Sequence, residues 1–231
     1  MADRSAALPL GMPTVAPTVA PPAPGELRRD LRLIAEMIEP GSRVLDIGCG
    51  DGALLAYLAR EKAVDARGME LSQSGVNACV RHGLSVIQGD ADRDLDAFPV
   101  GAFDVVVLSQ TLQATRRPRH VVETLVRIGK RAIVSFPNFG FWRIRLSLLR
   151  RGRMPVSELL NNPWYDTPNI HLCTIRDFVA MCDEIGVRVE RGITLDRHGR
   201  PYSLDPHGSL ANLLAEQSVF VLSENRNEAA R

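Results

Sequence analysis

A short stretch near residue 50 has the residue types needed to hold a small charged ligand. An apolar run from Arg43 to Ile47 predicts a buried strand, and three alternating glycines follow it, Gly48, Gly50 and Gly52. A helical pattern begins directly after the last glycine. A strand, a glycine-rich turn and a helix let the backbone approach a ligand closely and present free N–H groups. The stretch therefore predicts a site for a nucleotide or nucleoside cofactor.

The carboxylate of Asp46 distinguishes two cofactor classes. Gly48, Gly50 and Ala53 fit the G-x-G-x-x-A pattern of dinucleotide sites, with Glu70 at about the expected ~20-residue spacing. The alternative pattern, an acid followed by alternating glycines, resembles motif I of class I S-adenosylmethionine (SAM) dependent methyltransferases. A carboxylate here opposes an approaching pyrophosphate, whereas it accepts hydrogen bonds from an ammonium group. We therefore favour SAM, or S-adenosylhomocysteine, and keep NAD as the minor alternative.

Two further acidic residues follow predicted strands. Glu70 closes a strand predicted over 63–69, where a carboxylate can accept hydrogen bonds from both hydroxyls of a ribose. Asp90 and Ala91 follow a strand predicted over 84–88, and an acid there can accept from the exocyclic amine of adenine. With Asp46, the pattern predicts three carboxylates at three strand ends around one cofactor.

Candidates for contact with a methyl acceptor or a partner lie later in the chain. Gln110 ends the strand predicted over 103–109, and we assign it to the cofactor site and to an adjoining acceptor pocket. The loop 161–171 is dense in aromatic and amide residues, and loops of that length are usually functional. His171 is the one candidate general base. The predicted acceptor pocket consists of Gln110, Asn138, Trp164, Tyr165, Asn169 and His171.

The remaining pattern alternates helices with strands along the chain. Helices are predicted over 27–38, 53–58, 72–82, 118–128, 174–185 and 210–215, and strands over 43–47, 63–69, 84–88, 103–109, 130–136, 187–195 and 218–222. This order predicts an α/β fold with a doubly wound, mostly parallel, Rossmann-like sheet and helices on both faces. The last two strands predict an antiparallel pair at the sheet edge.

Composition sets the domain boundaries and the compartment. Residues 1–25 are rich in Pro and Ala and predict a disordered tail, residues 26–223 one domain, and residues 224–231 a flexible terminus. The chain has 231 residues and a formal net charge of +1, which gives no case for nucleic acid or a membrane as partner. Cysteines 49, 79, 173 and 182 lie far apart in sequence, so we expect no metal site, no disulfide framework and a reducing, cytoplasmic compartment.

Three longer strings are more specific than the glycines. They are the segments 136–142 (FPNFGFW), 151–155 (RGRMP) and 164–171 (WYDTPNIH). Together with the glycine motif and the acids, they resemble the MetW family of methionine-biosynthesis proteins across about residues 26–223. The resemblance implies the seven-stranded class I methyltransferase fold, and it implies action beside a homoserine O-acyltransferase, with which a complex is expected. It supplies no methyl acceptor.

Two functions follow from these observations and stay open at this point. In the first, the chain is a SAM-dependent methyltransferase, in which positioning and desolvation of the acceptor provide most of the catalysis. In the second, it is a non-catalytic regulatory or stabilising subunit of the acyltransferase that senses SAM. The basic segment 143–153 and the loop 161–171 then form the docking surface. An NAD-dependent oxidoreductase stays a minor third hypothesis, because no substrate acid–base pair accompanies the glycines.

Overall fold

The computed structural model describes residues 27–156, 160, 162–196, 198–202, 205 and 208–225. The predicted tail, 1–25, and all but two residues of the predicted C-terminal segment, 224–231, lie outside this described part. Within it, no helix is both long and apolar enough to cross a membrane.

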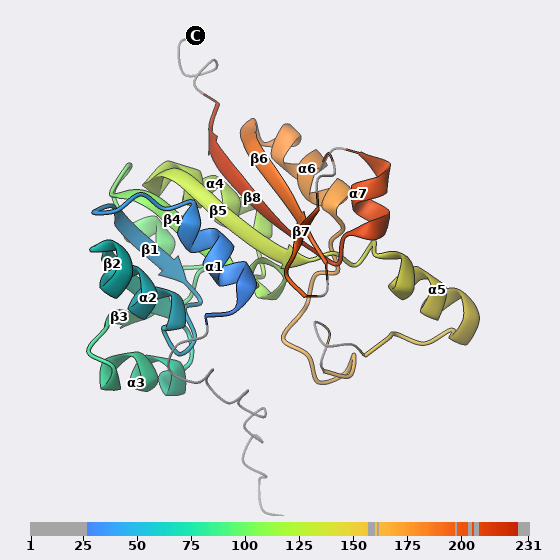
Figure 1. The fold of residues 1–231 in the computed structure, drawn as a ribbon, viewed down its shortest axis with the longest axis horizontal. Helices are drawn as coiled ribbons and strands as arrows, with labels where there is room; N and C mark the ends of the chain where they lie inside the picture. Colours follow the sequence, from blue (N-terminus) through green and yellow to red (C-terminus); the bar gives the residue numbers. More distant parts are fainter. Residues whose placement is uncertain are drawn as a thin grey trace, which may run out of the picture.

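One mixed sheet organises the chain, with the strand order β3-β2-β1-β4-β5-β8-β6-β7. The strands are β1 (Arg43–Ile47), β2 (Asp65–Glu70), β3 (Ser85–Gln88), β4 (Phe103–Ser109), β5 (Gly129–Pro137), β6 (Val187–Leu195), β7 (Pro201–Tyr202) and β8 (Gln217–Glu224). The first five strands pair in parallel, while β8 runs antiparallel between β5 and β6. Figure 1 shows the twisted sheet with helices before and behind it.

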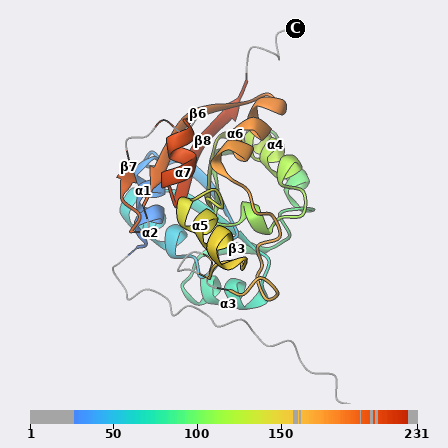
Figure 2. The same cartoon turned by 90° about the vertical axis from the view of Figure 1, so that its right-hand side faces the viewer.

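The helices cover both faces of this sheet. They are α1 (Arg29–Glu36), α2 (Ala53–Lys62), α3 (Gln73–Arg81), α4 (Pro118–Ile128), α5 (Trp142–Arg151), α6 (Ile175–Glu184) and α7 (Ser209–Leu214), with short 3-10 turns η1 (Leu95–Ala97) and η2 (Leu112–Ala114). The helix α5 projects away from the body, which is visible in Figure 1, and it lies on the side that faces the viewer in Figure 2.

Alternation along the buried strands divides the core in two. Val105 and Val107 of β4 pack with α1 and α2 on one face, whereas Val106 and Leu108 pack with α4 and α6 on the other. A strand buried on both faces therefore reads as an unbroken apolar run.

The helix boundaries have local causes that the sequence predicts. The Ser72 hydroxyl accepts from the Gly75 N–H, and Thr174 and Asp177 form a reciprocal capping box at the start of α6. Pro118 occupies the first turn of α4, where its missing N–H costs nothing.

The predicted fold class is confirmed, and the sheet adds one detail. The C-terminal strands do pair antiparallel, but β8 lies between β5 and β6, so the last long strand is not at the edge. The two-residue β7 pairs with the end of β6 and was not predicted. Pro201 lacks an N–H, and a proline in a strand is tolerated only at an edge.

Candidate functional site

The three predicted acids lie at or just after the carboxyl ends of neighbouring parallel strands. In the parallel register, Ile47 of β1 stands beside Met69 of β2, and Glu70 stands beside Gln88 of β3. The carboxyl ends of β1, β2 and β3 therefore adjoin one another, and we call Asp46, Glu70 and Asp90 the three-acid edge. Ligands of open α/β sheets bind outside such strand ends.

The glycine turn after β1 is shaped by three left-handed residues. Gly48, Gly50 and Gly52 have φ of 70°, 59° and 81°. A Cβ on Gly48 would lie 2.5 Å from the Thr111 hydroxyl oxygen, and one on Gly52 would lie 2.4 Å from a Leu84 methyl carbon. A Cβ on Gly50 would meet nothing within 4 Å. Packing thus requires the outer two glycines, while the middle one faces open space where a ligand can approach.

Glu70 ties this turn to the end of β2. Its Oε2 accepts the backbone N–H of Gly50 at 2.9 Å, and its Oε1 accepts the N–H and the hydroxyl of Ser72 at 2.9 and 2.8 Å. A carboxylate offers about four lone-pair positions. Oε2 therefore keeps capacity to accept from a sugar hydroxyl while Glu70 holds the turn in place.

Asp46 is the least satisfied of the three acids. Its side chain is 4% exposed, and within the described residues its carboxyl accepts no hydrogen bond. Burial, and to a smaller extent the nearby Glu70 carboxylate, raise the pKa of Asp46 from 3.8 to about 7 against the opposing effect of Arg28. A buried acceptor without a donor costs about 1–3 kcal/mol, so this group is prepared for a cationic donor.

Asp90 and Asp92 have different tasks although they are neighbours. Asp92 is buried, and its two carboxylate oxygens accept the backbone N–H groups of Arg116 and Arg117 at 2.7 and 2.8 Å. It therefore anchors the chain just before α4. Asp90 accepts through Oδ1 from the Asp92 N–H, and its Oδ2 lies 3.9 Å from Arg93 Nε. Asp90 Oδ2 is thus available to a ligand, and the partly exposed Ala91 lies beside it.

Gln110 has a strained backbone at the end of β4. Its φ is 53°, unusual for a residue with a side chain, and its N–H donates to the Ser135 carbonyl at 2.9 Å. Its side-chain Nε2 is buried without a hydrogen-bond partner among the described residues. The positive φ and the buried, unpaired Nε2 are both features that need an explanation.

These features fit a bound sulfonium nucleoside. The edge offers an unused buried carboxylate at Asp46, an unused donor at Gln110, and open space over Gly50. A pyrophosphate, in contrast, would meet the Asp46 charge directly.

The predicted acceptor residues do not form one pocket. Asn138 is buried, and its side chain is fully used by backbone groups: Nδ2 donates to the Asn212 and Ala215 carbonyls, and Oδ1 accepts from Gly140 and Ile175. It joins β5 to α6 and α7. The predicted substrate contact is therefore a structural residue with no hydrogen-bonding capacity left on its amide nitrogen.

Trp164 and Asn169 line a separate cavity of about 280 Å³ that we call the loop cavity, with Phe139, Met154, Pro155, Leu160, Asn162, Thr167, Ile170 and Leu172. The Trp164 and Tyr165 side chains are both 74% exposed and pack edge to face with ring centroids 5.7 Å apart. Side chains this exposed are better suited to contact with a second protein than to enclosing a small acceptor.

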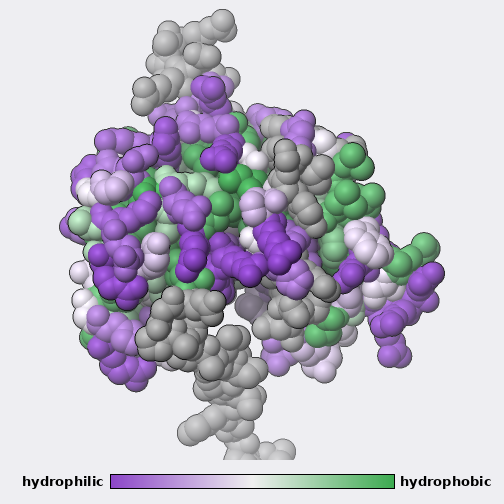
Figure 3. Space-filling model, in the orientation of Figure 1, coloured by the Kyte–Doolittle hydropathy of each residue, from purple (hydrophilic) through white to green (hydrophobic). Residues whose placement is uncertain are grey.

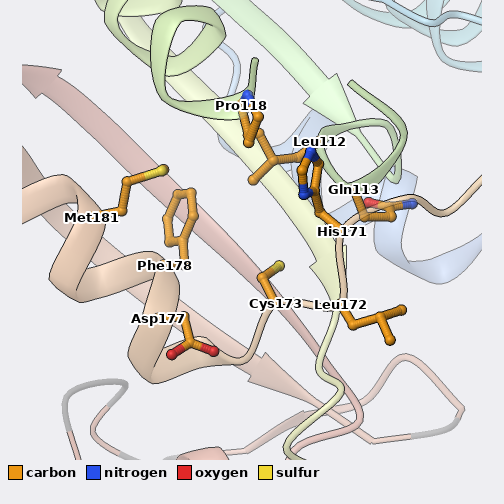
Figure 4. A pocket seen from close by; sticks show the side chains of 9 residues that line it. All are labelled: Leu112, Gln113, Pro118, His171, Leu172, Cys173, Asp177, Phe178 and Met181. Carbon is orange, nitrogen blue, oxygen red and sulfur yellow. The ribbon is translucent and has the colours of Figure 1, made fainter. Parts of the chain in front are cut away.

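His171 lies in another cavity, shown in Figure 4, which we call the α6 cavity. It measures about 260 Å³ and is lined by Leu112, Gln113, Pro118, His171, Leu172, Cys173, Asp177, Phe178 and Met181. Gln113 was not predicted. Its backbone carbonyl accepts the N–H groups of Ile170 and His171 at 2.9 and 3.0 Å. It therefore holds the backbone of His171 in place, although 58 positions separate the two residues in the sequence. Nothing in the local pattern around residue 113 indicates this contact.

The cysteines are free, as the sequence predicts, but two of them meet in space. Cys49 Sγ and Cys79 Sγ lie 3.9 Å apart beneath the glycine turn, although 30 residues separate them. Burial raises the pKa of both thiols, which keeps them protonated and unreactive.

Solved structures of other proteins share this fold. A SAM-dependent methyltransferase from Mesorhizobium loti superposes with a TM-score of 0.61 at 15% identity, over 84% of this chain and 97% of that one. The [4+2]-cyclase SpnF superposes with a TM-score of 0.59 at 19% identity, over 84% of this chain and 80% of that one. The fold, with β8 antiparallel between β5 and β6, is that of the class I SAM-dependent methyltransferases.

The family is narrower than this class. The sequence pattern described as "Methionine biosynthesis protein MetW" matches residues 28–222, and the chain belongs to the MetW family. A relative, the "Bifunctional methionine biosynthesis protein MetXA/MetW" of Rhodopirellula baltica, is 32% identical over 179 residues, which is 74% of this chain and 29% of that protein. The chain thus spans less than a third of that relative. It is a methionine-biosynthesis protein of the MetW type with a methyltransferase-like fold.

Proposed function

We propose that this chain binds SAM, or S-adenosylhomocysteine, at the three-acid edge. Asp46 receives the ammonium of the methionyl group, Glu70 the ribose hydroxyls, and Asp90 beside Ala91 the adenine amine. The turn Gly48–Gly50–Gly52 lets the backbone approach, and Gln110 Nε2 donates to the ligand. The observation that supports this most strongly is the buried Asp46 carboxyl, which accepts no hydrogen bond in the described structure.

Isothermal titration calorimetry with SAM and with NAD tests the assignment. We expect SAM to bind and NAD to bind far more weakly, because the NAD pyrophosphate would approach the Asp46 carboxylate. Tighter binding of NAD, or no binding of SAM at millimolar concentration, would remove the proposal.

We further propose that the chain acts with a homoserine O-acyltransferase. A relative carries a MetW-like unit together with MetXA in one chain, which supports physical association of two separate proteins as well. The surface proposed for it combines α5 with the segment 162–172. Leu149 on α5 is 84% exposed, and arginines 143, 145, 150, 151 and 153 are exposed around it. Figure 3 has apolar and hydrophilic side chains side by side on this projecting helix.

Charge reversal distinguishes this surface from the rest of the molecule. The double variant Arg150→Glu/Arg151→Glu should weaken co-purification with the acyltransferase at least about tenfold, because a basic rim steers and orients an acidic partner. The matched control, Arg32→Glu/Arg81→Glu, changes two exposed arginines on α1 and α3 by the same charge and should leave the yield unchanged. An equal yield from both variants argues against the α5 surface.

Whether methyl transfer accompanies binding separates the two functional hypotheses. Bound SAM supplies an activated methyl group, and in a transfer reaction His171 serves as the general base. The non-catalytic alternative, a SAM-sensing subunit of the acyltransferase, is favoured by Asn138, whose amide is consumed by the fold. The [4+2]-cyclase SpnF has the same fold, which also argues that this fold does not determine a reaction. Incubation with methyl-labelled SAM and cell extract decides: transferred label supports turnover, and its absence supports sensing.

A further inference from the structure

The α6 cavity lies beside the three-acid edge but is built from other elements. Thr111, next in sequence to Leu112, packs against Gly48 of the glycine turn. Leu112 and Gln113 form the near wall of the cavity, and Phe178 and Met181 of α6 form the far wall. Figure 4 displays the His171 ring beside Leu112 and Gln113, with Phe178 and Met181 on the opposite side. A ligand here would be a neighbour of the cofactor without sharing its contacts.

Two polar atoms of the residues that line this cavity have no hydrogen-bond partner within the described part of the chain. Gln113 is 4% exposed, and its Nε2 donates to the Gln110 carbonyl at 2.7 Å, which leaves Oε1 buried and unpaired. His171 Nε2 is likewise buried and unpaired in the described structure. Buried polar atoms are almost always satisfied, so two on one cavity wall indicate that something outside the protein satisfies them.

The remaining wall defines what that molecule can be. Leu112, Pro118, Phe178 and Met181 present hydrocarbon and a thioether, and among the described lining residues there is no lysine or arginine. Asp177 is exposed at the rim, and its carboxylate already accepts the N–H and the hydroxyl of Thr174. An anion would therefore meet an acidic rim and the Gln113 side-chain oxygen Oε1. A cation would lose its hydration without a buried counter-charge.

We propose that the α6 cavity binds a small, uncharged, mainly aliphatic molecule with one hydroxyl. The hydroxyl donates to Gln113 Oε1 and pairs with His171 Nε2, while the carbon chain packs between Leu112 and Met181. An imidazole nitrogen can donate or accept according to its tautomer, and a hydroxyl can match either state. This inference does not depend on SAM binding or on turnover.

Three probes with the same carbon chain test the charge preference. Saturation-transfer NMR and calorimetry with 1-pentanol, pentanoate and pentylammonium should give measurable binding of the alcohol and at least about tenfold weaker binding of both ions. The His171 imidazole signals should move only with the alcohol. Equal binding of the three probes, or tighter binding of either ion, overturns the proposal. No shift with any probe would mean that the cavity holds water only, and it overturns the proposal as well.

Two methionine variants separate this cavity from its neighbour. Met181→Trp fills the α6 cavity and should abolish alcohol binding, whereas Met154→Trp narrows the loop cavity and should leave it unchanged. His171→Leu keeps the backbone hydrogen bond to Gln113. It should weaken binding of the alcohol about tenfold while the NMR spectrum stays that of the folded protein. If Met154→Trp abolishes binding and Met181→Trp does not, the site lies elsewhere. Titration of SAM into Met181→Trp checks that the three-acid edge is intact.

Discussion

Two regions of the molecule are built in different ways: the glycine-turn side, which holds Asp46 and Glu70, and the loop side, which holds Asn138, Trp164 and His171. On the glycine-turn side, neighbouring parallel strands bring Asp46 and Glu70 together, because each residue lies near the carboxyl end of its strand. On the loop side, Asn138, Trp164 and His171 separate into a structural joint, an exposed surface and a cavity wall. Register alone places the first set, whereas contacts between distant segments place the second.

The same comparison divides the chemistry. Within the described residues, the glycine-turn side holds a buried carboxyl that accepts no hydrogen bond, which suits one cationic group of a defined ligand. The loop side presents two cavities of similar size and a projecting helix, which suits contact with a partner or a second ligand. The predictions below test whether the two sides are energetically as separate as they are structurally.

Asp46→Asn should have the largest effect. The variant loses the charge that pairs with the methionyl ammonium, so the SAM dissociation constant should rise about hundredfold, which corresponds to about 2.7 kcal/mol. The free variant should also be more stable than the parent at pH 8, because each pKa unit by which burial raises this acid costs about 1.4 kcal/mol once it ionises. Calorimetry and thermal unfolding measure the two effects.

Asp104→Asn is the matched control. Asp104 lies at the opposite end of β4, and its carboxylate is 2.7 Å from Lys130 Nζ. The hydrogen bond from Lys130, with help from Arg43, lowers the pKa of Asp104 to about 2. Its loss should reduce stability and leave SAM binding unchanged. A SAM affinity of Asp46→Asn within threefold of the parent value would contradict the role given to the three-acid edge.

Gly52→Ala should have the next largest effect, and it acts on folding. The new methyl would meet a Leu84 carbon at 2.4 Å and the Cys79 sulfur at 2.9 Å in a left-handed backbone, so we expect a loss of about 2–4 kcal/mol in urea unfolding. Gly50→Ala meets no atom and should lose only about 1 kcal/mol, from its positive φ. Its methyl group instead occupies the space through which SAM approaches the turn, and it should weaken SAM binding. Parent-like SAM affinity in Gly50→Ala would show that the ligand approaches elsewhere.

The pH dependence of SAM affinity should be smaller, about tenfold between pH 5.5 and 7. The ammonium needs an ionised Asp46, and because burial raises this pKa to about 7, the ionised fraction grows through that range. The contribution to folding has the opposite sign. The folded state keeps this proton to higher pH than the unfolded state, so stability present below about pH 4 is lost as pH rises towards 7. In Asp46→Asn the slope of affinity against pH should vanish.

Much of the fold could be predicted because its causes are local. The cap at Ser72, the capping box at Thr174 and the proline that opens α4 are each visible within four residues of sequence. The apolar run from Val105 to Leu108 identified β4, since a strand buried on both faces needs such a run. The position of β8 between β5 and β6 depends on pairing across more than 80 residues, and periodicity carries no record of it.

The candidate site could be predicted only as far as the sheet positions it. The three acids follow from strand ends, whereas the contact of the buried Asp92 with the segment before α4 joins residues 24 and 25 positions apart and was not predicted. Gln113 was missed because its role arises where 170–171 returns to the end of β4. The meeting of Cys49 with Cys79 was missed for the same reason. Local spacing does not encode such long-range contacts.

The exposed aromatic pair should show the smallest effect on folding and a clear effect on assembly. Trp164→Ser/Tyr165→Ser removes two side chains that are each 74% exposed, so the free energy of unfolding should change by under about 0.5 kcal/mol. Val100→Ser, 75% exposed before β4, is the control for loss of exposed apolar area. Co-purification with the acyltransferase should fall in the aromatic variant and not in the control, because buried aromatic anchors dominate interface energies. A large loss of stability would instead mean that the aromatic pair contributes to folding. The side chains of the loop side would then be as constrained by the fold as those of the glycine-turn side.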